Sequence, residues 1–233
     1  MDLLVFGPHP DDAEIGLGGA IARHAADGHE VGIVDLTAGE LSSNGTPECR
    51  RQEAEAAAKV LGLACRENLG WPDGGISNRP ELVRSAVEAI RRHRPQAIAI
   101  PHWHDRHPDH VRASEVLTAA AFASGLRRYA AEGDAWRPDW VCYYFINDSA
   151  APSFVVDVSA YYDQKWSALG CYRSQFAPVR DDGAVPTRLT APTFRTLIES
   201  RDAQFGALAG VAFAEGVVVR EPVQRATLLK RST

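Results

Sequence analysis

Histidine and aspartate side chains gather in two short segments of this chain, about a hundred residues apart. The residues of interest are His9, Asp11 and Asp12 in the first segment and His107, Asp109 and His110 in the second. Imidazole nitrogens and carboxylate oxygens are ligands that zinc and similar divalent ions take from proteins. Two histidines and one carboxylate form the protein ligand set of a catalytic zinc that keeps one position open for water. The two segments therefore indicate a metal-dependent hydrolase.

The metal ligands that we predict are His9, Asp12 and His110. Asp11 would then point in a different direction from Asp12 and stay free to take a proton from water. Zinc is the expected metal, although iron, manganese and cobalt accept the same ligands. Spacing alone leaves three more residues of the second segment open as substitute ligands: His102, His104 and Asp105.

Two other residues of the second segment are candidates for catalytic roles. His107 is not needed as a ligand and could steady the oxyanion or protonate the leaving amine. Asp109 could hydrogen-bond one imidazole and raise its basicity, or it could be an acidic residue favoured near a helix N-terminus. Pro108 suits the first position of a helix, and His107 and His110 are three residues apart, so both imidazoles can face one side.

The elements that must position these side chains are predicted from the apolar runs before them. Residues 3–6 and 97–100 are continuous apolar runs, typical of central parallel strands whose two faces are both covered. Each run leads into one of the two segments, and in open α/β sheets ligands bind beyond the carboxyl ends of the strands. We therefore predict an α/β, Rossmann-like fold with a mainly parallel sheet and helices on both faces.

The rest of the chain continues the alternation of helices and strands. Helices are expected at residues 15–27, 50–63, 80–93, 111–124, 158–169 and 194–208. Further strands are expected at residues 31–36, 65–69, 140–145, 154–158 and 217–219. Residues 176–186 are rich in Pro, Asp and Gly, which predicts a flexible flap or an oligomer contact.

Composition sets limits on the class of protein. The length of 233 residues suits one α/β domain, residues 1–233. A net charge of -5 gives no basic footprint for nucleic acid or a membrane surface. No apolar run reaches the ~18–20 residues of a membrane span, and the start of the chain does not resemble a signal peptide, so we expect a cytoplasmic protein. The four scattered cysteines indicate neither a disulfide framework nor a thiolate zinc site.

Arginines are the candidate contacts to an anionic substrate group. Arg50 follows the polar loop 37–48, which lies beyond the second predicted strand and is expected to help form the pocket. Arg51 is the alternative, and on a helix it would point about 100° away from Arg50. Arg137, beside Pro138 in a polar crossing, is a second candidate contact or a surface residue.

The two motifs also carry a family resemblance. His9-Pro-Asp-Asp12 together with His107-Pro-Asp-His110 resembles the LmbE-like, or PIG-L, family of zinc-dependent N-acetylglucosaminyl deacetylases. Residues 14–19, 35–46, 50–53 and 172–175 are similar to the bacillithiol biosynthesis deacetylase branch of that family. The wider family has Glu directly after the paired Asp residues, whereas this chain has Ala13 before Glu14, as that branch does.

The resemblance implies a Rossmann-like fold and a zinc-dependent deacetylase. The substrate in the bacillithiol branch is an N-acetylglucosaminyl-malate conjugate, a small amino-sugar whose carboxylates an arginine could bind. A homo-oligomer, and specifically a hexamer, is implied as well. The implied site residues are the zinc ligands His9, Asp12 and His110, the general base Asp11, the acid or oxyanion partners His107 and Asp109, and the substrate contact Arg50.

Other functions stay open at this point. One metal site of this kind could also serve an amidase acting on a thiol conjugate, or a deacetylase of another N-acetylglucosamine sugar such as diacetylchitobiose. A nucleotide-binding Rossmann module, with Asp35 reading a ribose, is disfavoured because the third glycine of G-x-G-x-x-G would fall at Ile21. A structural metal domain is disfavoured because structural zinc usually has four protein ligands.

Overall fold

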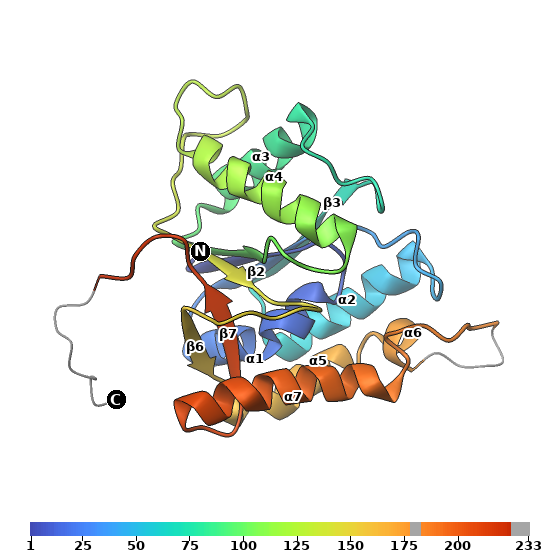
Figure 1. The fold of residues 1–233 in the computed structure, drawn as a ribbon. Helices are drawn as coiled ribbons and strands as arrows, with labels where there is room; N and C mark the ends of the chain where they lie inside the picture. The colour runs from blue at the N-terminus through green and yellow to red at the C-terminus, as the bar shows by residue number, and fades with distance from the viewer. Residues whose placement is uncertain (178–182, 225–233) are drawn as a thin grey trace.

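One seven-stranded sheet forms the centre of the computed structural model, which describes residues 1–177 and 183–224 (Figure 1). Its order is β3-β2-β1-β4-β5-β7-β6. Neighbouring strands from β3 to β5 pair in parallel, and β7 pairs antiparallel with β5 and β6. The strands are β1 (Leu3–Gly7), β2 (Val31–Thr37), β3 (Cys65–Trp71), β4 (Ala97–Pro101), β5 (Trp140–Tyr144), β6 (Phe154–Asp157) and β7 (Ala214–Val218).

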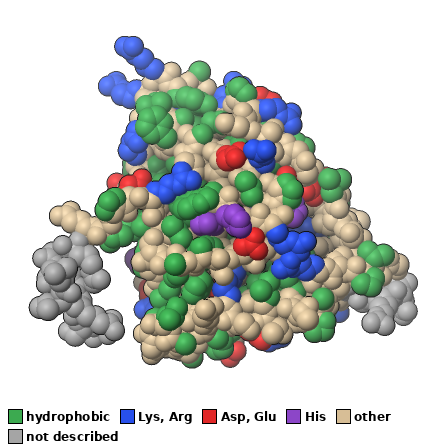
Figure 2. Space-filling view, in the orientation of Figure 1, with side chains coloured by type: hydrophobic (Ala, Val, Ile, Leu, Met, Phe, Trp, Pro, Cys, Tyr) green, Lys and Arg blue, Asp and Glu red, His purple; other side chains and the backbone are tan. Residues whose placement is uncertain are grey.

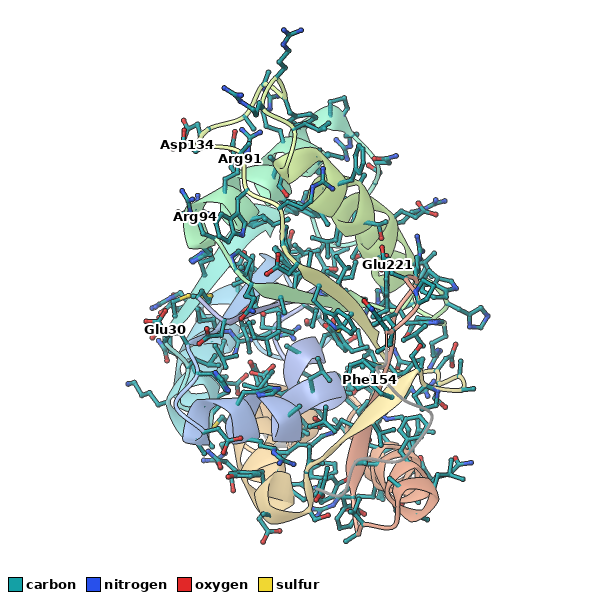
Figure 3. All side chains as sticks on the ribbon, turned by 90° about the vertical axis from the view of Figure 1, so that its left-hand side faces the viewer. Glu30, Arg91, Arg94, Asp134, Phe154 and Glu221 are labelled. Atoms are coloured by element: carbon teal, nitrogen blue, oxygen red, sulfur yellow. The ribbon has the colours of Figure 1, made fainter. Side chains whose placement is uncertain are left out.

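Helices cover both faces of the sheet, and Figures 1 and 3 show these layers from two sides. One face carries α3 (Pro80–His93) and α4 (Pro108–Ser124). The other face carries α1 (Asp12–Ala26), α2 (Pro47–Leu61), α5 (Tyr162–Leu169), α6 (Arg173–Phe176) and α7 (Pro192–Ala209). The predicted α/β fold with a mainly parallel sheet is therefore confirmed. No helix among the described residues has both the length and the apolar character needed to cross a membrane.

The two faces of β1 explain why its sequence is apolar without alternation. Val5 is fully buried in the core with α1, whereas Leu4 and Phe6 are fully buried in the core with α3 and α4. A strand covered on both faces needs an apolar side chain at every position. The same requirement accounts for the apolar run in β4.

Several elements begin earlier than the sequence predicts. α1 begins at Asp12 rather than at residue 15, and α2 begins at Pro47, where the side chain of Thr46 accepts a hydrogen bond from Cys49 N at 3.2 Å. Polar and proline residues of a first helical turn are not part of the apolar pattern, so the pattern misses them. β7 begins at Ala214 rather than at residue 217, and residues 178–182 of the predicted flap lie outside the described residues.

The carboxyl ends of the first four strands bring four loops to one edge of the sheet. β1 lies between β2 and β4. After β1 the chain adds β2 and β3 on one side of it, and then crosses back to add β4 on the other side. Such a topological switch point opens a crevice between the loops. The loops that meet there are residues 8–11, 38–46, 72–79 and 102–107.

α1 is broken shortly after the helical turn that carries Asp12. Leu17 has non-helical backbone angles (φ -137°, ψ 17°), so the helix consists of two parts. Gly19 N and Ala20 N, at the start of the second part, donate to the Glu215 carboxylate at 3.0 and 2.7 Å. Arg201 donates to Ile15 O, near the end of the first part, at 2.8 Å. The backbone groups freed by the break are therefore satisfied by α7 and β7.

Candidate active site

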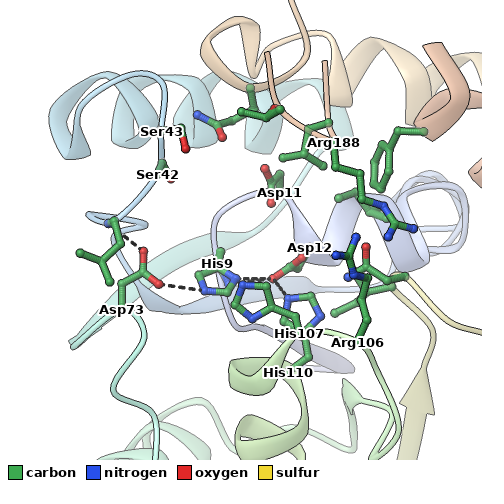
Figure 4. Close-up of a pocket in the computed structure, with 18 of the residues that line it drawn as sticks. His9, Asp11, Asp12, Ser42, Ser43, Asp73, Arg106, His107, His110 and Arg188 are labelled. Atoms are coloured by element: carbon green, nitrogen blue, oxygen red, sulfur yellow. Dashed lines mark hydrogen bonds and ion pairs between the residues drawn. The ribbon is translucent and has the colours of Figure 1, made fainter. Parts of the chain in front are cut away.

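The loop after β1 holds its functional residues on a stiff backbone. Pro8 and Pro10 flank His9, and each proline fixes its own φ. Asp11 has φ 118° and ψ -25°, a left-handed backbone that residues other than glycine seldom adopt. Because the chain changes direction there, Asp12 points toward the histidines while Asp11 lies away from them (Figure 4).

Three atoms of ligand type converge at the centre of the site. His9 Nδ1 lies 3.0 Å and His110 Nε2 lies 3.2 Å from Asp12 Oδ2, and the three residues offer ligand atoms within 4.8 Å of one another. Around a tetrahedral zinc with metal–ligand distances of ~2.0–2.1 Å, neighbouring ligand atoms lie ~3.3 Å apart. The arrangement therefore fits a divalent cation held by two imidazoles and one carboxylate.

The second ring nitrogen of His9 faces two carboxylates. Nε2 lies 3.2 Å from Asp73 Oδ1 and 3.4 Å from Asp109 Oδ2. Asp73 also accepts from Leu41 N at 2.9 Å, and Asp109 accepts from Gly74 N at 2.8 Å. Burial alone raises the pKa of Asp73, but the hydrogen bonds from His9 and Leu41 outweigh it and lower this pKa to about 2. Two ionised carboxylates at Nε2 keep the proton there and leave Nδ1 available to a metal.

Asp105 has the corresponding position at His110. Asp105 Oδ1 lies 3.1 Å from His110 Nδ1, and Asn147 donates to Asp105 from its backbone at 2.9 Å and from its side chain at 3.0 Å. Although burial raises the pKa of Asp105, its contacts with His110 lower this pKa to about 2. Asp105 therefore faces the far side of a candidate ligand. His102 and His104, the other possible substitutes, do not line the pocket.

Asp11 is paired with a buried arginine. Arg50 Nη2 lies 3.1 Å from Asp11 Oδ2, and the same guanidinium donates to Pro10 O and to Ser42 Oγ. Gly39, at φ 66°, leaves room for this guanidinium, because a Cβ at that position would overlap it. Burial raises the pKa of Asp11 to about 7, even though the charge of Arg50 lowers it. The carboxyl group is therefore tuned near neutral pH, where a general base is most effective.

His107 caps the start of α4 and presents a proton donor. Its Nδ1 accepts a hydrogen bond from Asp109 N at 3.2 Å. Burial first, and then the charges of His110 and His9, lower the pKa of His107. A neutral imidazole that accepts at Nδ1 carries its proton at Nε2. His9, His107 and Asp109 also lie close enough to hold an ion, but this tautomer leaves His107 no free lone pair at Nε2.

A cavity of about 530 Å³ opens above these residues (Figure 4). The apolar part of its wall consists of Ile15, Leu41, Ile146, Leu189 and Phe194. Its positively charged side chains are Arg50, Arg106 and Arg188. Figure 2 shows histidine side chains on this face, with acidic and basic side chains beside them. This volume suits a small ligand. A wall that combines apolar side chains with a few polar groups is typical of a ligand-binding pocket.

The structure brings most of the predicted site residues together, but not all of them. Arg50 lines the cavity, whereas Arg51 is exposed and pairs with Glu48 at 2.7 Å. Arg137 does not line the cavity; its guanidinium lies over the ring of Phe122, 5.3 Å from the centroid. It is therefore placed away from the groups that could act on a substrate.

Asp35 is engaged with a buried arginine. Arg66 donates to its two oxygens at 2.7 and 2.9 Å. Asp35 is therefore not available to bind a ribose, which counts against a nucleotide-binding module.

Asp73 is the main residue of the site that the sequence did not single out. It lies in the turn after β3, where no histidine or second carboxylate marks the segment. The available signal was its place beyond a strand end, at the edge where ligands bind. Its partner His9 is distant in the sequence, so only the fold reveals the contact.

The chain is similar to known proteins over most of its length. The chain is 40% identical to the conserved protein TT1542 from Thermus thermophilus, with a TM-score of 0.89 over 99% of this chain and 100% of that one. It is 28% identical over 230 residues to a diacetylchitobiose deacetylase of Thermococcus kodakarensis, covering 92% of this chain and 81% of the relative.

The fold by itself does not decide the reaction. A 4-carboxy-2-hydroxymuconate hydratase from Pseudomonas putida KT2440 matches with a TM-score of 0.79 at 21% identity, covering 98% of this chain and all of that one. The model of the PIG-L family, described as GlcNAc-PI de-N-acetylase, matches residues 4–121 and includes both histidine motifs. Because this match covers just over half of the residues, the chain belongs to the PIG-L family of de-N-acetylases.

Proposed function

We propose that this protein is a metal-dependent enzyme that hydrolyses the acetamide of an N-acetylglucosaminyl conjugate, releasing acetate and a free amine. The observation that carries the proposal is the convergence of His9, Asp12 and His110 beside Asp11, a buried carboxyl group that pairs with Arg50 and does not belong to the ligand set. These groups lie at the base of a cavity of suitable size in a chain of the PIG-L family. Zn²⁺ is the metal that we favour for this ligand set.

The proposed reaction assigns different tasks to the two neighbouring aspartates. A divalent cation held by His9, Asp12 and His110 would polarise the amide carbonyl and acidify water. Asp11 takes the proton from the water that adds to the carbonyl carbon. Arg50 holds Asp11 in place and favours its ionised form. The separation of roles depends on the backbone of Asp11, which directs its carboxyl group away from the ligand set.

His107 supports the later part of the reaction. Its Nε2–H can donate to the oxygen that becomes negatively charged as water adds. When the C–N bond breaks, the departing nitrogen must gain a proton to leave as an amine, and His107 or the protonated Asp11 can deliver it. Asp109 acts on this site indirectly, since its carboxylate touches His9 and Gly74 N while only its backbone N–H touches His107.

N-acetylglucosaminyl-malate, in bacillithiol biosynthesis, is the substrate that we favour. The similarity of residues 35–46 and 50–53 to the bacillithiol branch supports this choice. The same similarity is the basis for proposing a homo-oligomer, and specifically a hexamer. A cytoplasmic location is proposed from the absence of a signal-peptide pattern in the given sequence. Light scattering coupled to size-exclusion chromatography tests the assembly.

The test of the function is acetate and free-amine release from N-acetylglucosaminyl-malate, with metal-stripped protein and with Zn²⁺ restored. Acetate release that disappears on stripping and returns with the metal supports the proposal. If neither this conjugate, N-acetylglucosamine nor diacetylchitobiose is turned over in a metal-dependent way, the proposal is wrong.

Two related reactions would use the same residues. Deacetylation of a diacetylchitobiose-type sugar is supported by the Thermococcus kodakarensis relative, and it would appear as a preference for diacetylchitobiose in the same assay. An amidase acting on a bacillithiol-type thiol conjugate would cleave a different amide of a similar glycoside. Release of a mercapturate rather than acetate would identify that reaction.

A further inference from the structure

Two arginines stand at the mouth of the cavity from elements that are far apart in the sequence. Arg106 lies in the loop between β4 and α4, and Arg188 lies in the segment before α7. Both line the cavity that contains the candidate metal ligands. In Figure 4 the two side chains extend from opposite rims toward the same part of the opening.

The other charges of the cavity already have partners. Arg50 is buried and bound to Asp11, while Asp73 pairs with His9. Asp12 belongs to the candidate metal ligands. Arg50 is therefore unsuited to bind an additional anion unless it releases the proposed base.

Arg106 and Arg188 differ from Arg50 in this respect. Both are exposed, and within residues 1–177 and 183–224 neither guanidinium has a carboxylate at ion-pair distance. The described contact of Arg188 is with the ring of Phe194, whose centroid lies 5.8 Å from the guanidinium carbon. Among the described residues, no carboxylate therefore neutralises the positive charge of Arg106 and Arg188 at this part of the mouth.

We propose that Arg106 and Arg188 form a binding site for an anionic group on the aglycone of the substrate. This inference rests on the proposed deacetylase function and assigns substrate preference to these two residues instead of Arg50. Guanidinium groups bind carboxylates and phosphates through paired, charge-assisted hydrogen bonds. The site would therefore select glucosaminides whose aglycone carries carboxylate or phosphate.

The covalent structure of an N-acetylglucosaminide makes this placement reasonable. The acetamide is attached to C2 and the aglycone to C1, the adjacent ring carbon. When the acetamide reaches the metal ligands, the aglycone must lie nearby in the same cavity. Side chains at the mouth of that cavity can then contact an aglycone without touching the reacting amide.

The experiment compares four substrates: N-acetylglucosaminyl-malate, its dimethyl ester, N-acetylglucosamine 1-phosphate and methyl N-acetylglucosaminide. The variants are Arg106→Gln and Arg188→Gln. Their controls are Arg112→Gln and Arg195→Gln, exposed arginines of α4 and α7 that pair with Glu115 and Glu199 outside the cavity. Thermal melting verifies that every variant is folded.

Each cavity variant is expected to raise the KM of the malate conjugate about tenfold or more, as loss of a charge-assisted hydrogen bond would. The neutral methyl glycoside and the diester should keep their wild-type kcat/KM within about twofold, and the control variants should change none of the four substrates. The KM of the malate conjugate should also rise with salt concentration, because exposed charges are screened. A higher kcat/KM for N-acetylglucosamine 1-phosphate than for the malate conjugate would still support the arginine site and would identify phosphate as the group that it binds.

Two outcomes separate this inference from the proposed function. Metal-dependent deacetylation with equal kcat/KM for charged and neutral substrates, unchanged in both variants, would overturn the arginine site and leave the deacetylase intact. If no substrate is turned over, calorimetric binding of glucosaminyl-malate still decides the matter. Binding that Arg106→Gln and Arg188→Gln weaken supports the site, and equal or undetectable binding in all proteins refutes it.

Discussion

At the scale of single residues, the chemistry of this site depends on keeping two adjacent carboxylates apart. Asp11 and Asp12 are neighbours in sequence, and both are buried. The left-handed backbone of Asp11 lets Arg50 pair with one carboxylate while His9 and His110 contact the other. Such backbone strain costs of order 1–3 kcal/mol and persists where the surrounding structure enforces it.

Asp11→Asn should lower kcat by about 10²–10⁴, the usual contribution of a general base. Its metal content should stay at the wild-type level, because Asp11 is not among the convergent ligand atoms. The wild-type kcat/KM should rise with pH as Asp11 ionises, with a midpoint at or below about 7, since burial raises this pKa and a bound cation would lower it. Rate profiles and metal analysis of both proteins test this, and a near-wild-type rate for Asp11→Asn would rule out its role as base.

The carboxylates behind the histidines should control metal affinity. Asp73→Asn and Asp105→Asn should each weaken metal binding about 10–100-fold, the effect usual for partners of ligating histidines. Asp105→Asn removes the carboxylate that faces His110 Nδ1, and Asp73→Asn removes one of the two carboxylates that face His9 Nε2, so each weakens the hold on the proton that points away from the metal. Chelator competition measures the affinity. Asp134→Asn, at an exposed position labelled in Figure 3, is the matched control and should bind metal like the wild type.

At the scale of elements, the break in α1 shows how distant segments position the first turn of a helix. Lys165 of α5 is fully buried and lies 2.6 Å from Asp202 and 2.7 Å from Glu215. The Glu215 carboxylate also accepts hydrogen bonds from Gly19 N and Ala20 N of α1. Gly16 lies against the ring of Tyr144, where a Cβ would overlap the ring. The part of α1 before the break, with Asp12, is thereby held against β5 through Gly16 and against α7 through Arg201, while β7 holds the part after the break.

Glu215→Ala should lower the free energy of unfolding by about 3–5 kcal/mol, the range for breaking a buried ion pair. The substitution leaves Lys165 with one carboxylate instead of two and removes the acceptor for Gly19 N and Ala20 N. Glu221→Ala removes an exposed carboxylate (Figure 3) and should change stability by no more than about 0.5 kcal/mol. Urea unfolding of the three proteins measures the difference, and a small loss for Glu215→Ala would show that the network is not needed for stability.

At the scale of the whole molecule, the site exists because four strand ends meet at one edge. Among the metal candidates, His9 comes from the loop after β1, while Asp12 and His110 come from the first turns of α1 and α4. The carboxylate partners Asp73 and Asp105 come from the loops after β3 and β4. A cation bound across these loops would join segments that the sheet alone only brings near. Metal binding is therefore expected to stabilise the fold as a whole.

Addition of Zn²⁺ at a hundredfold excess over Kd should stabilise the folded protein by about 2.7 kcal/mol and raise the Tm. Burial alone lowers the pKa of His110, but Asp12 and Asp105 outweigh it and raise this pKa to about 9 without a metal. At pH 7 the imidazole is then protonated, so metal binding must release a proton, and affinity should increase as the pH rises above 7. Calorimetry in buffers of different ionisation enthalpy measures this release. Asp12→Ala should lose the metal-dependent rise in Tm, and binding without proton release would contradict the assignment.

The sequence alone determined the class of fold and the family. Continuous apolar runs ending in polar loops predicted parallel strands, and β1 and β4 were found at those runs. The two histidine motifs predicted the PIG-L resemblance that the family match confirmed. These properties are readable because strand burial and motif spacing are local features of the chain. The roles of the individual site residues stay predictions for the experiments above.

Only the tertiary structure decided which charged groups meet. It placed Asp73 at His9 and Asp105 behind His110, and it buried Arg50 against Asp11 while leaving Arg137 on Phe122. It also brought Arg106 and Arg188, which no sequence pattern connects, to one cavity. The physical reason is that such contacts depend on loop conformation and strand order, which join residues distant in the chain, whereas hydrophobic periodicity reports only whether a segment is buried.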